Sequence, residues 1–334
     1  MAPNLWLGLL LTLLAGLLSG NCMLPMKFAI RWPWENTWLV FSVVSLVILP
    51  WALAFALVND VRAVYAALPA AAFVAPLGFG AGWGIAQVLF GLSIARLGLA
   101  LGYAIIVGLG ALLGTLVPLL VKHREVIGTG RGALILSGVA IMVLGIAVSA
   151  HAGRAREGSS ERTASGSYAA ALAIAVLCGL MAPMLNYAFA FGQSIADEAV
   201  RQGASPQSAG YAVWPIALLG GLIPNAGYSV WLLSHNGTWD RFRGAWRPDV
   251  WFGCLMGVFW MGAFAIYGVS SVYLGALGTS VGWALFQIFM IMTANLSGVL
   301  TGEWKTAPAS AKRGLWAGLA LLAAATAVIA AGNR

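Results

Sequence analysis

Residues 80–98, GAGWGIAQVLFGLSIARLG, decide how this chain folds, because their pattern returns 177 residues later as GVFWMGAFAIYGVSSVYLG in residues 257–275. Six positions are identical at this single offset: Gly80, Trp83, Gly91, Ser93, Leu97 and Gly98 match Gly257, Trp260, Gly268, Ser270, Leu274 and Gly275. Each copy is a nearly unbroken apolar run of the length that crosses a bilayer as a helix. A repeat at this distance indicates that the chain consists of two related halves.

The composition of the whole chain agrees with a membrane protein. Its 334 residues are 61% hydrophobic and 8% charged, and the mean hydropathy is +0.89. Soluble domains carry about 25% charged residues, so this chain lacks the polar surface that water requires. These values exclude soluble globular, disordered, coiled-coil and secreted disulfide-rich proteins. They predict an all-α membrane protein that crosses the bilayer several times.

The apolar runs predict about ten transmembrane helices, since a span needs roughly 20 mostly apolar residues. The runs are continuous and do not alternate with polar residues, which favours helices over a β-barrel. The predicted spans lie near residues 4–26, 37–58, 70–94, 98–121, 132–150, 168–190, 209–233, 250–273, 276–300 and 314–332.

Two halves of five helices each follow from the repeat and from the most polar break. We predict a first repeat in residues 1–155, a polar linker in 156–167 and a second repeat in 168–334. A second echo supports this division, because MLPM in residues 23–26 resembles MAPM in residues 181–184. An odd number of helices per half makes the second half enter from the opposite face. The expected architecture is therefore a 5+5 inverted repeat, as in many secondary transporters.

The net charge of +8 is best explained by topology. Basic residues lie in short loops, where they set orientation, so nucleic-acid binding is not expected. Twelve of the 18 Lys and Arg residues fall on the side of the predicted linker. If that side is cytoplasmic, the chain is a multi-pass protein of the bacterial inner membrane, with both termini in the periplasm.

The inventory of reactive side chains argues against an enzyme. The three histidines lie in loops or at helix ends, no HExxH motif occurs, and no Asp or Glu lies in the middle of a predicted span. Zinc-dependent, serine–histidine and aspartyl intramembrane proteases are thereby excluded. We expect no catalytic residues, no metal site and no cofactor.

Neutral polar and aromatic side chains within the spans suggest a substrate that is uncharged. Amides bind hydroxyl groups without the cost of burying a charge, and indole faces pack on the apolar C–H patches of a sugar ring. The alternative is that these residues form interhelical hydrogen bonds and interfacial aromatic belts. The candidate substrate-binding residues are Trp83, Gln87, Asn225, Trp260, Trp283 and Gln287.

Several motifs resemble the bacterial L-rhamnose–proton symporters of the drug/metabolite transporter superfamily. They are WPWENTW in residues 32–38, ILPW in 48–51, GWG in 82–84, RLG in 96–98 and GTL in 114–116, with Asn225, Trp283 and Glu303-Trp304. The resemblance covers nearly the whole chain in order. It implies ten helices in a 5+5 inverted repeat and the uptake of a 6-deoxyhexose such as L-rhamnose with a proton.

One position departs from the family pattern. The family has an acidic residue shortly before the tryptophan of the ninth helix, where this chain has Thr279. Proton coupling normally uses an ionisable group. The remaining candidates for proton coupling are Glu35 and Glu303, both near predicted helix ends. The alternative is that they anchor those ends by pairing with Lys27, Arg31 or Lys305.

Two other functions remain open at this point. The same architecture serves varied substrates, so the chain is alternatively an exporter or facilitator of another small metabolite. A membrane receptor that binds a sugar without moving it belongs to a different class, although no signalling domain is evident. The partners expected are thus a small sugar, a proton and the lipid bilayer. The sequence does not indicate an oligomeric state.

Overall fold

The computed structural model describes residues 4–97, 99–157, 168–244 and 246–333, and within these ranges it contains helices and no strand. Ten described segments are long and apolar enough to cross a membrane. The prediction of an all-α multi-pass membrane protein with about ten spans is therefore confirmed.

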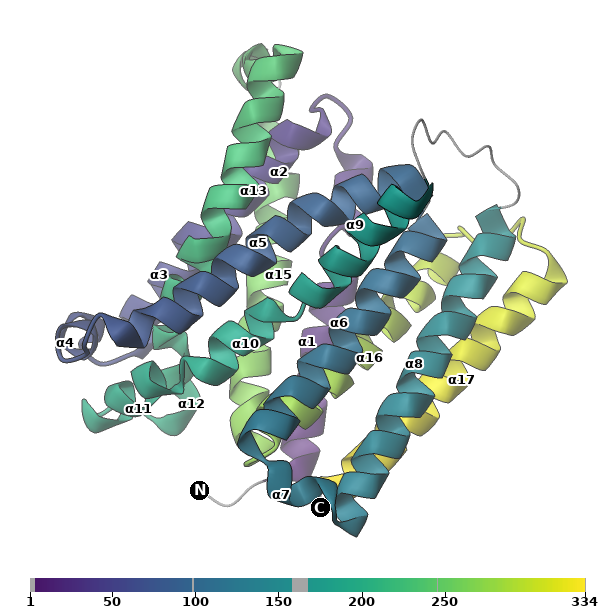
Figure 1. The fold of residues 1–334 in the computed structure, drawn as a ribbon. Helices are drawn as coiled ribbons and strands as arrows, with labels where there is room; N and C mark the ends of the chain where they lie inside the picture. The colour runs from purple at the N-terminus through teal and green to yellow at the C-terminus, as the bar shows by residue number, and fades with distance from the viewer. Residues whose placement is uncertain (1–3, 98, 158–167, 245, 334) are drawn as a thin grey trace.

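Six of the spans are single helices and four are built from several pieces or are bounded by short turns (Figure 1). The first half contains α1 (Leu5–Asn21), η1 (Leu24–Phe28), α2 (Trp34–Val43), η2 (Val44–Ile48), α3 (Leu49–Leu57), α4 (Val61–Ala66), α5 (Ala71–Leu97), α6 (Leu99–Lys122), α7 (Arg124–Ile127) and α8 (Gly130–Glu157). The second half contains α9 (Tyr168–Met181), α10 (Met184–Phe191), α11 (Gln193–Arg201), α12 (Pro206–Ala209), η3 (Gly210–Ala212), α13 (Trp214–Asn236), η4 (Thr238–Asp240), α14 (Arg241–Gly244), α15 (Trp246–Tyr273), α16 (Gly278–Leu300) and α17 (Ala309–Gly332). Helix α8 includes the first two residues of the predicted linker, and residues 158–167 lie outside the described residues.

Prolines explain the breaks within spans, because proline cannot donate the backbone hydrogen bond that continues a helix. Pro183 separates α9 from α10, and Pro25 lies in the 3₁₀ turn η1 that follows α1. The MLPM and MAPM echoes thus occupy equivalent breaks after the first helix of each half. Pro50 follows η2, a single π-helical turn that widens the helix just before it.

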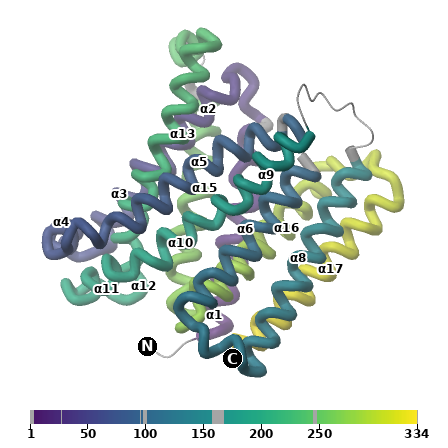
Figure 2. Tube along the Cα trace, viewed as in Figure 1, coloured from purple at the N-terminus to yellow at the C-terminus, as the bar shows by residue number. Residues whose placement is uncertain are grey.

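The packing of the helices pairs the two halves reciprocally (Figures 1 and 2). Helix α1 packs against α15 and α16, while α9, the first helix of the second half, packs against α5 and α6. Helix α5 crosses α13, and α15 crosses α2. Helices α8 and α17 lie along each other at one edge of the molecule, where their nearly pure apolar composition suits contact with lipid. The start of α1 and the end of α17 lie at the same end of the molecule, opposite the end of α8 and the start of α9.

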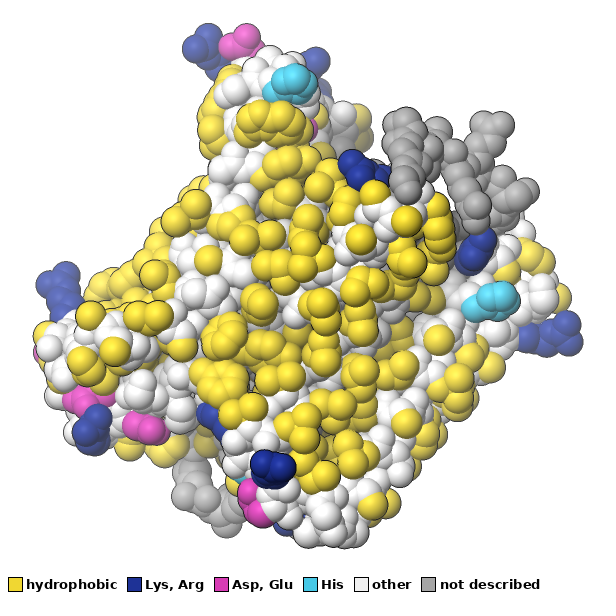
Figure 3. Space-filling model, in the orientation of Figure 1, with side chains coloured by type: hydrophobic (Ala, Val, Ile, Leu, Met, Phe, Trp, Pro, Cys, Tyr) yellow, Lys and Arg dark blue, Asp and Glu magenta, His cyan; other side chains and the backbone are white. Residues whose placement is uncertain are grey.

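The flank of the molecule is apolar, and charged side chains gather at the two ends (Figure 3). Large exposed side chains include Leu17, Phe55, Leu77, Leu144 and Ile223. Such a surface would be unfavourable in water and suits the hydrocarbon core of a bilayer. The figure and the ten spans together support a chain embedded across the membrane.

The crossing of α5 and α13 depends on glycines at the contact. A Cβ placed on Gly80 would lie 1.8 Å from the carbonyl oxygen of Ala217, and one on Gly220 would lie 2.1 Å from that of Leu77. These backbones therefore touch directly, as small residues permit in membrane helices. The crossing brings the first and second halves together in the centre of the molecule.

We expect Gly80→Ala to destabilise the protein by about 1–3 kcal/mol, because the added methyl group forces two rigid backbones apart. The measurement is the midpoint of thermal unfolding in detergent. The matched control is Gly78→Ala on the same helix, where a Cβ would meet no atom within 4 Å. Equal midpoints for the two variants would contradict the close helix crossing.

Candidate functional site

Two tryptophans from equivalent positions of the repeat stack on each other in the centre. Trp83 on α5 and Trp260 on α15 have ring centroids 5.2 Å apart, with 28° between the ring planes. Both are almost completely buried. Gly221 of α13 lies against the Trp83 ring, where a larger side chain would displace it. The repeat thus places the same side chain from each half at one point between the halves.

Further aromatic rings connect this pair to the third candidate tryptophan. Phe264 lies one turn beyond Trp260, at 4.4 Å between centroids, and contacts Phe286 of α16 at 5.4 Å. Phe286 in turn contacts Trp283 at 5.8 Å. The Trp283 indole N–H donates to the carbonyl oxygen of Gly110 on α6 at 3.1 Å. Trp283 therefore belongs to the same aromatic cluster, but its polar atom is already satisfied by the protein.

The two candidate glutamines lie one helical turn beyond these tryptophans. Gln87 follows Trp83 on α5 and is half-buried, while Gln287 follows Trp283 on α16 and is buried. Neither amide has a hydrogen bond to a described residue. A buried amide without a partner is costly unless a ligand or water completes it. The pair thus offers free donors and acceptors next to the aromatic cluster.

Asn225 is engaged by the protein itself. Its Nδ2 donates to the Gly221 carbonyl at 2.9 Å, and its Oδ1 accepts the indole N–H of Trp38 at 3.3 Å. Trp38 contacts Phe41, and Phe41 contacts Trp260 edge-on at 6.1 Å. Asn225 therefore reaches the aromatic cluster through Trp38, a residue that sequence reasoning did not place in the site.

A buried polar network that sequence reasoning also missed centres on Asn186, just after the proline break in the sixth span. Its Nδ2 donates to the carbonyl oxygens of Gly114 at 2.9 Å and Thr279 at 3.0 Å, and its Oδ1 accepts the hydroxyl of Tyr267 at 2.6 Å. One side chain thus joins α10 to α6, α15 and the start of α16. Tyr267 also contacts Trp283, so the network supports one side of the aromatic cluster.

We expect Asn186→Leu to cost about 1–3 kcal/mol of stability, because it leaves the buried Tyr267 hydroxyl with only the Thr279 carbonyl oxygen, at 3.5 Å, as its acceptor. Thermal unfolding in detergent measures the effect. Asn295→Leu is the matched control, since Asn295 on α16 bonds only to the carbonyl of Ile291 in its own helix. Two variants of equal stability would show that the network does not hold these helices together.

The two candidates for proton coupling, Glu35 and Glu303, lie in different environments. Glu35, in the first turn of α2, is 5% exposed, and its Oε1 accepts hydrogen bonds from Asn236 Nδ2 at 3.0 Å and Thr238 Oγ1 at 2.9 Å. Its partners are an amide and a hydroxyl, and among the described residues no ion pair joins it to Arg31. Glu303 forms an ion pair with Arg156 at 3.1 Å near the surface. Neither carboxylate touches the aromatic cluster.

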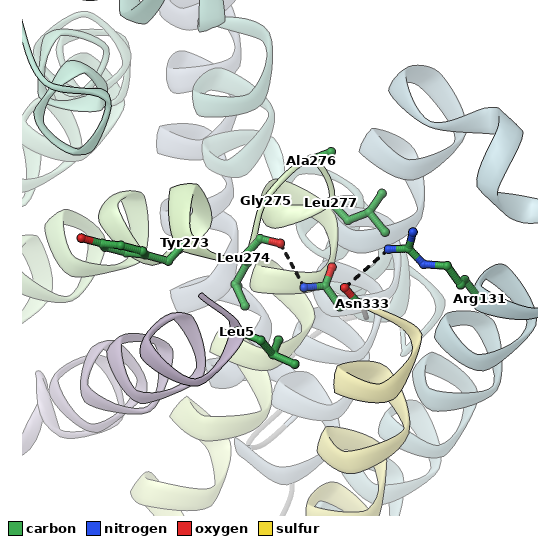
Figure 4. Close-up of a pocket in the computed structure, with 8 residues that line it drawn as sticks. All are labelled: Leu5, Arg131, Tyr273, Leu274, Gly275, Ala276, Leu277 and Asn333. Carbon is green, nitrogen blue, oxygen red and sulfur yellow. Dashed lines mark hydrogen bonds between the residues drawn. The ribbon is translucent and has the colours of Figure 1, made fainter. Parts of the chain in front are cut away.

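A cavity of about 420 Å³ lies away from these residues, at the end that carries both termini (Figure 4). Arg131 points toward Asn333 there, and Asn333 Nδ2 donates to the carbonyl oxygen of Leu274 at 3.0 Å. None of the candidate substrate-binding residues lines this cavity. The candidate site itself is filled by the stacked rings of Trp83 and Trp260 in this conformation.

The chain is similar to known proteins along nearly its whole length. A family model described as L-rhamnose-proton symport protein (RhaT) matches residues 1–333. The L-rhamnose-proton symporter of Cronobacter sakazakii is 30% identical over 304 residues, which cover 88% of each chain. That of Mannheimia succiniciproducens is 27% identical over 327 residues, covering 95% of each. A solved crystal structure matches 96% of this chain and 95% of its own, with a TM-score of 0.59 and 18% identity, which shows a shared fold.

Proposed function

Because this chain belongs to the L-rhamnose-proton symport protein family, we propose that it takes up L-rhamnose, or a similar 6-deoxyhexose, together with a proton. The observation that carries this proposal is a family match that extends from residue 1 to residue 333 in a chain with ten membrane spans. The family name describes a proton-coupled sugar transporter and not an enzyme. We assign the wider drug/metabolite transporter superfamily on the resemblance alone.

The substrate site of this proposal is the aromatic cluster between the halves. A sugar ring would pack its C–H face on Trp83 or Trp260, and the amides of Gln87 and Gln287 would bind its hydroxyls. Trp283 and Asn225 would shape the site and hold the neighbouring rings, since their polar atoms are bonded within the protein. Because Trp83 and Trp260 stack on each other, binding must separate these rings.

Transport requires the site to open alternately to each side, and an inverted repeat provides this by symmetry. The division into residues 1–155 and 168–334 is supported by the reciprocal helix pairs, by the 177-residue offset and by the equivalent proline breaks. We call the end of the molecule where α8 ends and α9 begins the linker end. The twelve basic residues that the sequence assigns to this side favour a cytoplasmic location for it. Both termini would then be periplasmic, in a bacterial inner membrane.

Purified protein in proteoliposomes tests the function directly. We expect labelled L-rhamnose to accumulate when an inward proton gradient is imposed, and to equilibrate without accumulation when the gradient is collapsed. Transport of another solute in place of L-rhamnose would contradict the substrate. Accumulation of L-rhamnose that persists without a proton gradient would contradict proton coupling. Counterflow against sugars, amino acids and amines separates uptake of this sugar from the alternative metabolites.

A further inference from the structure

A second buried carboxylate, Asp249, lies at the same end of the molecule as Glu35. It occupies the first turn of α15 and is 2% exposed. Its Oδ2 accepts the backbone N–H groups of Arg31 at 3.1 Å and Trp32 at 3.0 Å, in the segment between η1 and α2. A carboxylate of the second half therefore holds the backbone of the first.

Glu35 makes the reverse connection, because its donors Asn236 and Thr238 belong to the second half. Two more bonds join the same segments: Asn36 Nδ2 donates to the Thr238 carbonyl at 3.2 Å, and Trp32 Nε1 to the Arg241 carbonyl at 3.0 Å. Residues 31–36 and 236–249 are thus joined by six hydrogen bonds, and the two carboxylates accept four of them.

The opposite end is held differently. There Asn59 donates to the carbonyl of Gly203, Lys122 to that of Ala190 and Arg131 to that of Gly332. Among the described residues, the carboxylates that bridge the two halves are Glu35, Asp249 and Glu303, all at the linker end. Carbonyl acceptors bind no proton in the accessible pH range, whereas carboxylates bind one at acidic pH. A proton can therefore remove an acceptor from bridges at the linker end.

We propose that Glu35 and Asp249 form a reciprocal, proton-sensitive latch between residues 31–36 and 236–249. Ionised, the two carboxylates hold the linker end closed; protonated, they release it. Protonation weakens the latch because hydrogen bonds to an ionised carboxylate are roughly twice as strong as those between neutral groups. The role of the latch in transport, which is to open the cytoplasmic end when the proton is bound, rests on the proposed function. The latch itself does not.

The charged groups around the latch determine how it responds to pH. Lys27 and Arg31 precede Glu35, Arg247 precedes Asp249, and η4 and α14 contribute Asp240, Arg241 and Arg243. Asp240 is exposed and lies 3.5 Å from Arg243. His235, next to Asn236, stacks on Trp231 with ring centroids 5.2 Å apart. His235→Gln serves as a control for a response that does not come from the carboxylates.

A cysteine at position 37 reports on the latch without any substrate. Thr37 is 1% exposed on α2, and its carbonyl oxygen lies 3.3 Å from the position of a Cβ on Gly253, one turn beyond Asp249 on α15. In a background with Cys22, Cys178 and Cys254 replaced by serine, Thr37→Cys is alkylated, and its rate is divided by that of the denatured protein at the same pH. We expect the rate to rise roughly tenfold as the pH falls through the range in which carboxylates titrate.

The latch variant and its controls are expected to differ in how the alkylation rate depends on pH. Asp249→Asn should be alkylated rapidly at all pH values, whereas Asp249→Glu and Asp197→Asn, an exposed carboxylate at the other end, should keep the pH dependence. In proteoliposomes, Asp249→Asn should lose gradient-driven accumulation and keep counterflow. Slow alkylation in Asp249→Asn, or a pH dependence that His235→Gln abolishes, would overturn the latch. Absence of L-rhamnose transport by the unmodified protein would overturn the proposed function alone, since alkylation needs no sugar.

Discussion

Trp260→Leu is expected to lower the kcat/KM of L-rhamnose uptake by at least about tenfold, whereas Trp260→Phe should retain most of it. The reason is that an aromatic face packs on the C–H patch of a sugar, and leucine offers no such plane. An aromatic contact is worth about 0.5–1.5 kcal/mol beyond the apolar area that it buries. Together with the smaller apolar area of leucine, the loss reaches about 1.5 kcal/mol or more, which corresponds to about tenfold. Initial rates of uptake over a range of sugar concentrations provide the measurement.

A control must separate binding from packing, since Trp260 is also part of the core. Trp214 is the matched residue, because it is 1% exposed and stacks on Phe189 with centroids 4.7 Å apart, in the same aromatic cluster. It is not among the proposed ligands of the sugar. Trp214→Leu should reduce stability and the amount of folded protein, but the KM of the folded fraction should be unchanged. Equal changes in KM for the two variants would show that Trp260 acts only through packing.

The repeat in the sequence identified Trp83 and Trp260 as equivalent residues, and the structure stacks them on each other. The number of spans was also predictable, because the hydrocarbon core requires long apolar runs whatever the tertiary packing. Both predictions rest on properties of single segments or on one internal comparison.

The polar contacts were not predictable from the sequence, because their partners are distant in the chain. Asn186 bonds to carbonyl oxygens of α6 and α16, and any residue type supplies a carbonyl oxygen. Asp249 likewise accepts from backbone N–H groups more than 200 residues away. Glu303 pairs with Arg156, although nearby Lys305 was the cation that the sequence suggested. Composition indicates that such groups need partners but does not say which ones.

Glu35→Gln is expected to abolish gradient-driven accumulation of L-rhamnose while leaving counterflow within about threefold of the unmodified protein. Glutamine offers Asn236 and Thr238 only a neutral oxygen, as the protonated acid does, and it cannot bind or release a proton. Counterflow exchanges sugar without net proton movement, whereas accumulation requires it. The two assays on the same proteoliposomes therefore distinguish a coupling residue from a structural one.

Glu303→Gln is the matched control, and the structure predicts a different outcome for it. The Glu303 side chain is 36% exposed and pairs with Arg156 at the surface, where an ion pair contributes about 0–1 kcal/mol. It should retain both accumulation and counterflow. If Glu303→Gln lost accumulation and Glu35→Gln did not, the proton would be carried by the surface pair. If Glu35→Gln lowered both activities equally, Glu35 would serve only to hold α2 against the end of α13. The burial of Glu35 and its two neutral donors from the other half favour the first result, because protonation there changes the contact between halves on which alternating access depends.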